Sequence, residues 1–271
     1  MSFRINPDPS FKDALIAADR SLAGIWVCSG SPLVAEICAG AGFDWIFIDA
    51  EHSPNGLESI LAQLQAVRGY PVIPVVRPPV NDTVIIKQYL DVGVQSLIVP
   101  MVNSAAEARA AVAACHYPPL GVRGVGSALA RSARWNRIPD YLNRAGETLT
   151  LMVQIESAQA VENVEEIVHT EGVDGIFIGP SDLAASMGVI GQQDHPEVVA
   201  AVEKSIAAGK SAGKFVGVNA FAEQSIKHYI ELGADFVGVG ADVALLARGS
   251  EALAAKFAAG HDAVSGTPAS Y

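Results

Sequence analysis

Residues that can carry out chemistry follow five separate apolar runs of this sequence. The runs span 43–48, 72–76, 151–153, 176–178 and 215–218, and the polar residues after them are Asp49, Glu51 and His52; Arg77; Gln154 and Glu156; Ser181 and Asp182; and Asn219. Two carboxylates can bind a hard divalent cation, and an arginine can bind an oxyanion. A histidine beside a carboxylate can move a proton. These residue types indicate metal-assisted or acid–base chemistry, provided that the fold brings them together.

Eight apolar runs, continuous rather than alternating, indicate parallel strands that are buried on both faces. They lie near 22–27, 44–49, 72–77, 96–100, 150–155, 175–179, 215–219 and 236–240, and helical patterns fill the gaps, for example at 54–68, 81–92 and 104–114. This alternation predicts an α/β fold of the (β/α)8 or TIM-barrel class, with an open doubly wound sheet as the alternative. In a barrel, the carboxyl ends of the strands share one face, which holds the active site.

Two segments fall outside this repeat. A helix at 10–21 precedes the first strand, and we expect it to cover the bottom of the barrel. Segment 116–147 is too long for an ordinary connection. It is interpreted as following the fourth strand, and therefore as lying at the barrel mouth as a lid, a substrate clamp or a subunit contact. We expect a single domain over residues 1–259 and a disordered tail over 260–271.

The bulk composition narrows the classes of partner. The chain has 271 residues and a net charge of −11, which disfavours nucleic acid and anionic membrane surfaces. No apolar run approaches the roughly 18 residues that a membrane span needs, and the N-terminus lacks the apolar core of a signal peptide. The three cysteines, Cys28, Cys38 and Cys115, form no metal-ligand pair. A reduced, cytoplasmic location is therefore expected.

Glu156 and Asp182 are the candidate metal ligands. Each comes just after a strand, and consecutive strands place their carboxylates near one another at the barrel mouth. Two carboxylates with waters and substrate oxygens suit Mg²⁺ or Mn²⁺. Helix capping is the alternative for Asp182, because acidic residues are favoured at helix starts. The turn Gly179-Pro-Ser-Asp182 also offers backbone N–H groups that can bind a carboxylate or phosphate.

Asp49 and His52 are the candidate proton-transfer pair. An aspartate can fix the tautomer of an imidazole and stabilise its charged form. Of the six histidines, only His52 lies just beyond the carboxyl end of a predicted strand. The alternative is an ordinary surface-loop histidine. Glu51 is expected to support this pair from outside the reaction centre, through metal-bound waters or through Arg77.

Arg77 ends the third strand and is followed by Pro78-Pro79, which prevents further strand pairing. A guanidinium buried at a barrel mouth needs an anion. A structural salt bridge to Glu51 or Asp49 would satisfy this need, and stabilisation of a developing enolate would use it.

None of the seven lysines lies at the carboxyl end of a predicted strand. They are Lys12, Lys87, Lys204, Lys210, Lys214, Lys227 and Lys256. A barrel aldolase that works through a Schiff base needs a lysine inside the mouth. Carbonyl chemistry in this chain is therefore expected to use a metal as Lewis acid.

At the level of motifs, the chain resembles the HpcH/HpaI aldolase family over roughly residues 11–257. The motifs that carry the resemblance are Asp49-Ala-Glu-His-Ser-Pro54, Val75-Val-Arg-Pro78, Tyr117-Pro-Pro-Leu-Gly-Val-Arg-Gly-Val-Gly-Ser127, Gln154-Ile-Glu156 and Gly179-Pro-Ser-Asp182. The resemblance implies a class II aldolase that uses Mg²⁺, Mn²⁺ or Co²⁺, on a (β/α)8 barrel. It implies reversible cleavage of 4-hydroxy-2-oxo acids, such as 4-hydroxy-2-oxoheptanedioate, to pyruvate and an aldehyde, in aromatic compound catabolism. It also implies a homohexamer whose last helices are exchanged between subunits.

The resemblance also assigns roles to individual residues. It implies that Glu156 and Asp182 bind the metal, that Ser181 and Asp182 lie near the pyruvate carboxylate, that Arg77 binds the keto oxygen, that Gln154 positions pyruvate, and that Asp49 and His52 transfer protons. Asn219 is a departure, because similar family members carry apolar residues in this segment. That segment faces the aldehyde, so Asn219 is a candidate substrate-binding residue.

Several alternatives remain open from the sequence. Arg123 is a candidate partner for the second carboxylate of an acidic aldehyde, or a residue that fixes the loop or contacts another subunit. An acyl-CoA lyase of the citrate-lyase type would need a basic groove, which this acidic chain does not show. A non-catalytic barrel that binds small acids would not need the metal and proton-transfer residues.

Overall fold

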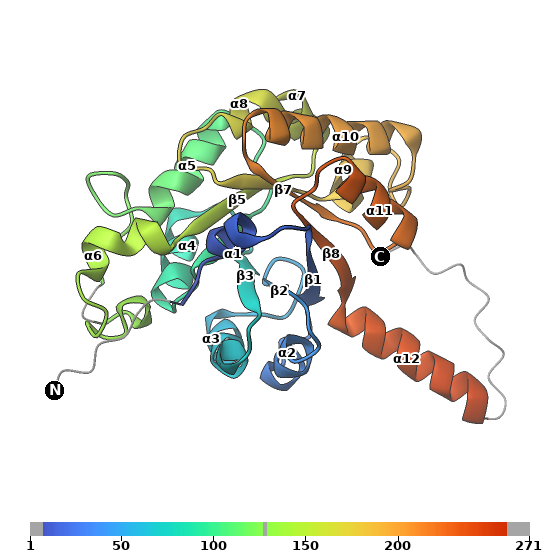
Figure 1. Ribbon diagram of the computed structural model, residues 1–271, viewed down its shortest axis with the longest axis horizontal. Helices are drawn as coiled ribbons and strands as arrows, with labels where there is room; N and C mark the ends of the chain where they lie inside the picture. The colour runs from blue at the N-terminus through green and yellow to red at the C-terminus, as the bar shows by residue number, and fades with distance from the viewer. Residues whose placement is uncertain (1–7, 127–128, 259–271) are drawn as a thin grey trace.

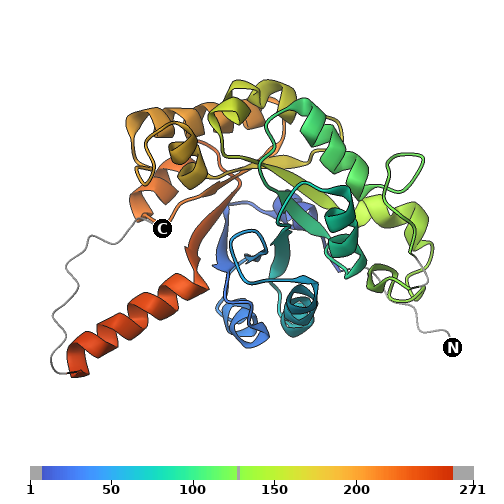
Figure 2. The same cartoon turned by 180° about the vertical axis from the view of Figure 1, so that it is seen from behind.

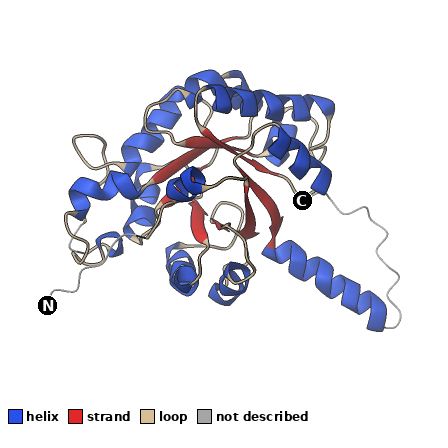
Figure 3. Ribbon diagram, viewed as in Figure 1, coloured by secondary structure: helices blue, strands red, loops and turns tan. Residues whose placement is uncertain are grey.

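The computed structural model describes residues 8–126 and 129–258. Its strands are parallel and form one closed barrel in sequence order, with β8 paired with β1 (Figures 1 and 3). They are β1 (Leu22–Val27), β2 (Trp45–Asp49), β3 (Ile73–Arg77), β4 (Ser96–Val99), β5 (Thr150–Ile155), β6 (Gly175–Ile178), β7 (Phe215–Asn219) and β8 (Phe236–Ala241). The predicted barrel is confirmed, the open sheet is excluded, and each strand boundary lies within one residue of its predicted position.

Helices surround this barrel. They are α1 (Phe11–Ala17), α2 (Pro32–Ala39), α3 (Leu57–Ala66), α4 (Thr83–Asp91), α5 (Ala105–Cys115), α6 (Tyr141–Arg144), α7 (Ala158–Glu162), α8 (Val164–Val168), α9 (Pro180–Ser186), α10 (Pro196–Ser211), α11 (Glu223–Glu231) and α12 (Asp242–Phe257), with short 3₁₀ turns η1 (Val67–Gly69), η2 (Arg131–Ala133) and η3 (Ala145–Thr148). None of the described helices is long and apolar enough to cross a membrane.

The core has two layers, one on each side of the strands. Aliphatic side chains fill the space between the strands and the surrounding helices. Aromatic side chains fill the barrel interior, where Trp45, Phe47, Phe177 and Phe236 are fully buried. Their rings are 5.3–6.4 Å apart wherever they contact one another. The interior is therefore solid below the mouth, and the buried charged residues of the described strands, Asp49 and Arg77, lie at carboxyl ends.

Helix α1 closes the bottom of the barrel, as predicted, although it ends at Ala17 rather than near residue 21 (Figure 1). Phe11 is fully buried, and its ring lies 5.4 Å from Trp45 and 5.0 Å from Phe236. The hydroxyl oxygens of Ser96 and Thr150 accept hydrogen bonds from the first two backbone N–H groups of the helix. The helix start is thus paired with the strands, because these N–H groups have no partner inside the helix.

Segment 116–147 corrects one expectation. It follows helix α5, which ends at Cys115, and precedes β5, which begins at Thr150. A helix-to-strand connection reaches the amino ends of the strands, so the described residues of the segment, 116–126 and 129–147, lie on the side of their own barrel opposite the mouth. The predicted position at the mouth was wrong, because it assumed that the segment directly follows β4. Helix α5 follows β4, and the long segment comes only after that helix.

Helix α12 projects away from the barrel (Figures 1 and 2). Five of its large apolar side chains are exposed within the single chain: Val243, Leu245, Leu246, Leu253 and Phe257. Exposed apolar patches of this kind mark contact surfaces more often than free surface. The predicted tail at 260–271 lies outside the described residues.

We predict that Gly217→Ala destabilises the barrel by about 1–3 kcal/mol. A Cβ at this position would lie 2.1 Å from the Phe236 ring, and that ring is held by Phe11 and Trp45. Urea unfolding measures the loss. Gly69→Ala is the control, because its Cβ would meet no atom within 4 Å. Equal stability of the two variants would contradict the packing argument.

Candidate active site

The carboxyl ends of β2, β3 and β5 bring four buried polar side chains to the mouth of the barrel. Asp49, Arg77, Gln154 and Glu156 are each at most 3% exposed. Asp49 and Arg77 are direct partners in the β2–β3 register, which sets their side chains side by side. The sequence prediction that these residues share one face is therefore met by the fold, while their chemical roles stay predictions.

Arg77 forms two ion pairs at the centre of this group. Its Nε donates to Asp49 Oδ1 at 2.7 Å, and its Nη1 lies 2.7 Å from Glu51 Oε2. Burial alone would lower the pKa of Arg77, but Asp49 and Glu51 outweigh it, so the pKa lies above the ordinary value. The guanidinium also lies over the Trp26 ring, 4.7 Å from its centroid. Arg77 is thus a fixed cation, and its Nη2 has no protein partner among the described residues.

The carboxylate of Asp49 is occupied by Arg77 and by its own turn. Oδ1 also accepts the backbone N–H of Glu51, and Oδ2 accepts the backbone N–H of His52 and the hydroxyl of Ser53. Burial would raise the pKa of Asp49, but Arg77 outweighs it, so the pKa is lowered. The expected bond from Asp49 to the imidazole of His52 is not formed, because the turn folds back and fills the carboxylate with backbone donors.

His52 lies at the open edge of the mouth. Its side chain is 63% exposed, and its Nε2 lies 3.9 Å from Glu51 Oε2. Glu51 therefore faces both Arg77 and the imidazole of His52, whereas Asp49 bonds to His52 through its backbone N–H. Burial raises the pKa of Glu51, and nearby Asp49 and Asp182 raise it further, although Arg77 and His52 act in the opposite direction.

Glu156 is held by two donors at the end of β5. Its Oε1 accepts the backbone N–H of Met101 at 2.7 Å, and its Oε2 accepts the amide of Gln154. Burial raises the pKa of Glu156 to about 7, and the carboxylates of Glu51 and Asp182 raise it too, although the Met101 bond and Arg77 lower it. Met101 has a φ of 52°, which is uncommon for a residue other than glycine. Met101 could not be predicted as a site residue, because it contributes only a backbone group.

Gly179 gives Glu156 and Gln154 the space that they occupy. A Cβ at residue 179 would lie 2.8 Å from Gln154 Nε2 and 3.1 Å from Glu156 Oε2. Asp182 follows in the first turn of α9 and is exposed. The hydroxyl of Ser181 accepts a hydrogen bond from Gln193 at 2.6 Å. The α9 start thus lies against the end of β5, as the sequence predicted.

A divalent cation fits this group of acids. Besides burial, Asp182 raises the pKa of Glu51, and Glu51 and Asp182 raise the pKa of Glu156. Arg77 acts to lower the pKa of both glutamates. The buried Oε1 of Gln154 has no hydrogen-bond partner. No group of three or more His, Cys, Asp or Glu side chains in the described part of the chain could hold a metal ion. Glu156 and Asp182 stay the predicted ligands, and with only these two carboxylates the other ligands would be water and substrate oxygens.

Asn219 lies at the carboxyl end of β7, where it contacts Trp26. Its Oδ1 accepts a hydrogen bond from Trp26 Nε1 at 2.8 Å. Trp26 in turn contacts Arg77 through its ring face. Asn219 is half-buried, so its remaining amide N–H groups can face the mouth. Trp26 itself was missed in the sequence, where it has the appearance of an ordinary core residue in β1.

Arg123 lies away from these groups. It is fully buried, its Nη2 donates to Asp91 at 2.9 Å, and its guanidinium lies 4.5 Å from the centroid of the Tyr117 ring. Asp91 ends α4, at the amino-end side of the barrel. This position matches the loop-fixing alternative, and a role toward an acidic aldehyde stays a prediction that this chain's own barrel does not support.

The lysines are also remote from the strand ends. Lys214 precedes β7 and donates to the carbonyl of Val173 at 2.7 Å, and the other six lie in helices. All seven belong to the described residues. No lysine is therefore placed at the end of a strand, where Schiff-base chemistry would need one.

The chain is similar in sequence to a known family and to named relatives. The model of the HpcH/HpaI aldolase/citrate lyase family matches residues 22–249. A relative from Shigella sonnei, named 4-hydroxy-2-oxo-heptane-1,7-dioate aldolase, is 56% identical over 255 residues, which cover 94% of this chain and 97% of the relative. A relative of the same name from Salmonella typhi is 55% identical and covers 92% and 95%.

Solved structures show the same relationship. An HpcH/HpaI aldolase/citrate lyase family protein from Burkholderia cenocepacia has a TM-score of 0.86 and 38% identity, covering 90% of this chain and 97% of the other. An HpcH/HpaI aldolase from Desulfitobacterium hafniense has a TM-score of 0.84 and 28% identity, covering 94% and 99%. With the family model spanning the whole barrel and close relatives covering nearly the full chain, this protein belongs to the HpcH/HpaI aldolase/citrate lyase family, as a carbon–carbon lyase of the aldolase type.

Proposed function

We propose that this enzyme catalyses the reversible, divalent-metal-dependent cleavage of 4-hydroxy-2-oxo acids, such as 4-hydroxy-2-oxoheptanedioate, to pyruvate and an aldehyde. The observation that carries the proposal is the buried Arg77 guanidinium, set among carboxylates with no lysine at the strand ends. The names of the close relatives support the same substrate class. We place the enzyme in a reducing compartment, the cytoplasm, because its three cysteines are free.

Binding of the 2-oxo acid is assigned to β3, β5 and the start of α9. Backbone N–H groups of Ser181 and Asp182 suit the substrate carboxylate, because they lie in the first turn of a helix. The amide of Gln154 positions the 2-oxo acid beside Glu156. The free Nη2 of Arg77 donates to the 2-oxo oxygen, and this bond strengthens as the oxygen gains charge in the enolate.

Proton transfer is assigned to His52. In cleavage, an imidazole nitrogen takes the proton of the 4-hydroxyl group, the C3–C4 bond breaks, and the electron pair is delocalised onto the 2-oxo oxygen beside Arg77. Glu51 lies 3.9 Å from His52 Nε2 and can stabilise the imidazolium. Asp49 acts as a positioning residue, because it holds Arg77 and the backbone of the 49–53 turn.

The metal site is assigned to Glu156 and Asp182. When bound there, Mg²⁺, Mn²⁺ or Co²⁺ would supply Lewis-acid polarisation of the 2-oxo group. The mutually repelling carboxylates of the mouth support this assignment, because a cation offsets their repulsion.

We also propose a homohexamer in which α12 packs on a neighbouring subunit. The exposed apolar side chains of α12 support an interface on this helix. The family resemblance supports the hexamer and the exchange of last helices.

Chelation should abolish pyruvate release, and Mg²⁺, Mn²⁺ or Co²⁺ should restore it. The reason is that the chain has two oxygen ligands and no usable lysine. A coupled assay of pyruvate release before and after EDTA measures the effect. Full activity in excess EDTA, or pyruvate trapped on a lysine by borohydride, would refute metal dependence.

Arg77→Ala should remove both aldol cleavage and the exchange of pyruvate C3 protons with solvent, because both reactions form the enolate. Arg77→Lys should restore little, since an ammonium cannot pair with Asp49 and Glu51 and also bind substrate in the same plane. Proton NMR in D₂O measures the exchange. Near-normal exchange by folded Arg77→Ala would remove its assigned role, and no exchange by the native protein would favour a passive binding barrel.

His52→Ala should lower kcat by a factor on the order of 10²–10⁴ while leaving pyruvate binding nearly unchanged. The side chain is 63% exposed, so its removal should not disturb the fold. Steady-state kinetics with a thermal-unfolding check measure both properties. His116→Ala is a matched control, because His116 bonds the Val112 carbonyl away from the mouth. An unchanged kcat in His52→Ala would assign proton transfer to another group.

Asn219→Leu should shift preference from hydroxyaldehydes toward aliphatic aldehydes by roughly tenfold in kcat/KM. The change removes the acceptor of Trp26 Nε1 and the amide N–H groups that can face the mouth. Trp26→Phe in the Asn219→Leu background removes the unpaired indole N–H. It therefore separates the loss of the Trp26 bond from the loss of the Asn219 amide at the mouth. An unchanged ratio in Asn219→Leu for aldehydes of equal length would show that Asn219 does not contact the aldehyde.

A further inference from the structure

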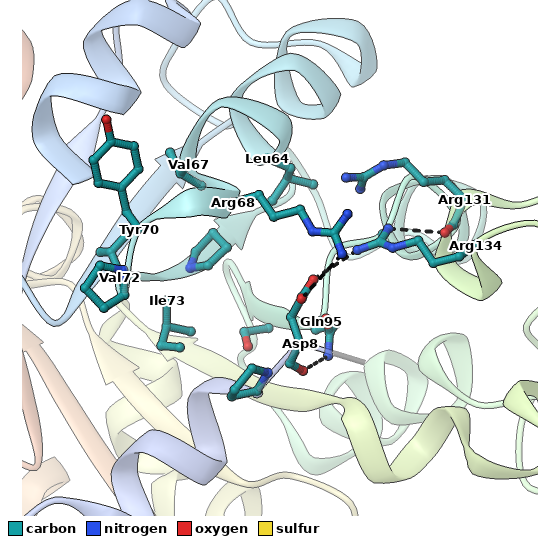
Figure 4. A pocket seen from close by; sticks show the side chains of 15 residues that line it. Asp8, Leu64, Val67, Arg68, Tyr70, Val72, Ile73, Gln95, Arg131 and Arg134 are labelled. Carbon is teal, nitrogen blue, oxygen red and sulfur yellow. Dashed lines mark hydrogen bonds and ion pairs between the residues drawn. The ribbon is translucent and has the colours of Figure 1, made fainter. Parts of the chain in front are cut away.

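A pocket lies at the end of the barrel opposite the mouth. It has a volume of about 190 Å³ and is lined by the starts of β3 and β4, by η1 and η2, and by the residues before α1 (Figure 4). Ile73, which begins β3, forms part of its wall, whereas Arg77 ends the same strand at the mouth. Four residues of strand separate the two positions by about 13 Å. The pocket is therefore distinct from the candidate active site.

Three arginines and one carboxylate meet in this pocket, as Figure 4 shows. Arg134 Nη2 lies 3.0 Å from Asp8 Oδ2, and Arg68 Nη2 lies 3.8 Å from Asp8 Oδ1. Arg131 has no acidic partner among the described residues, and its Nη1 donates to the carbonyl of Val92 at 2.6 Å. The pocket therefore carries an excess of positive charge in a chain whose net charge is −11.

The guanidinium groups of Arg131 and Arg134 lie close together over the backbone of Gly93. A Cβ on Gly93 would lie 2.6 Å from Arg131 Nη1 and 3.3 Å from Arg134 Nη1, so both guanidiniums lie over this glycine. Burial, with repulsion from Arg134 and Arg68, lowers the pKa of Arg131 to about 10, and Asp8 only partly opposes this. An added anion would relieve the repulsion. The seven residues before Asp8 contain Arg4 and no acidic residue, so they cannot supply one.

The remaining wall is largely apolar. Leu64, Val72 and Ile73 line it, together with the amide of Gln95. That amide is already used, because it donates to the carbonyl of Asp8 at 2.8 Å. A cavity of roughly 150 Å³ is enough to hold a benzene ring. A ligand that fits this pocket therefore has one anionic end and a small apolar body.

We propose that this pocket binds a small carboxylate with an apolar body of about the size of benzoate. The carboxylate lies between Arg131 and Arg68, where planar guanidinium groups match its two oxygens. The apolar body lies against Leu64 and Val72.

Titration calorimetry of benzoate into the full-length protein tests this assignment, with acetate and inorganic phosphate as comparison ligands. Arg68→Gln should weaken benzoate binding roughly three- to tenfold, because it removes one of the three positive charges. Asp8→Asn should tighten binding by a similar factor, because Asp8 is the only carboxylate among the described residues that line the pocket. Arg20→Gln is the matched control, since Arg20 is an exposed arginine paired with Asp44 outside this pocket.

The expected result is a higher Kd for benzoate in Arg68→Gln, a lower Kd in Asp8→Asn and an unchanged Kd in Arg20→Gln. Because Asp8→Asn also breaks two ion pairs, its melting temperature is measured alongside. If Asp8→Asn proves to be unfolded, the result for Arg68→Gln alone tests the proposal. Absence of saturable benzoate binding, or equal binding by all variants, would overturn the site. Tighter binding of phosphate than of benzoate would overturn the ligand class. Unaltered benzoate binding with altered sedimentation in Arg68→Gln would assign the arginines to a subunit contact instead.

Discussion

The ion pairs of one buried arginine organise the mouth of this barrel. Arg77 forms ion pairs with both Asp49 and Glu51, and its guanidinium lies over the Trp26 ring. A buried guanidinium is costly unless its charge is compensated, so the positions of both acids depend on it. Asp49 in turn holds the backbone that carries His52. One interaction thus connects the anion-binding group, the histidine and the aromatic wall of the site.

Much of the fold could be predicted because its strands are buried on both faces. All five residues of β2 are buried, and the first four, Trp45 to Ile48, form a continuous apolar run in the sequence. The rule that barrel active sites lie at strand carboxyl ends then selects Asp49, Arg77 and Glu156 from among many charged residues. These positions follow from pattern alone, since a closed parallel barrel leaves little freedom in where a strand end can point.

Hydrogen-bond partners could not be predicted in the same way. Whether Asp49 accepts from an imidazole or from its own turn depends on backbone angles that residue types do not specify. Met101 contributes a backbone N–H, so its side chain carries no signal. Segment 116–147 was misplaced because the order of elements, rather than composition, decides which end of the barrel a connection reaches.

Helix α1, which closes the bottom of the barrel, limits how early the chain can fold during synthesis. Phe11 and Lys12 donate to Ser96 and Thr150, 85 and 138 residues later in the chain. The first strand likewise needs β8, which begins at Phe236, as its second neighbour. Until most of the polypeptide has left the ribosome, the earliest helix and the edge of β1 lack their partners. Nascent chains are therefore exposed to aggregation through these surfaces for most of translation, and chaperone demand should fall only when β8 emerges.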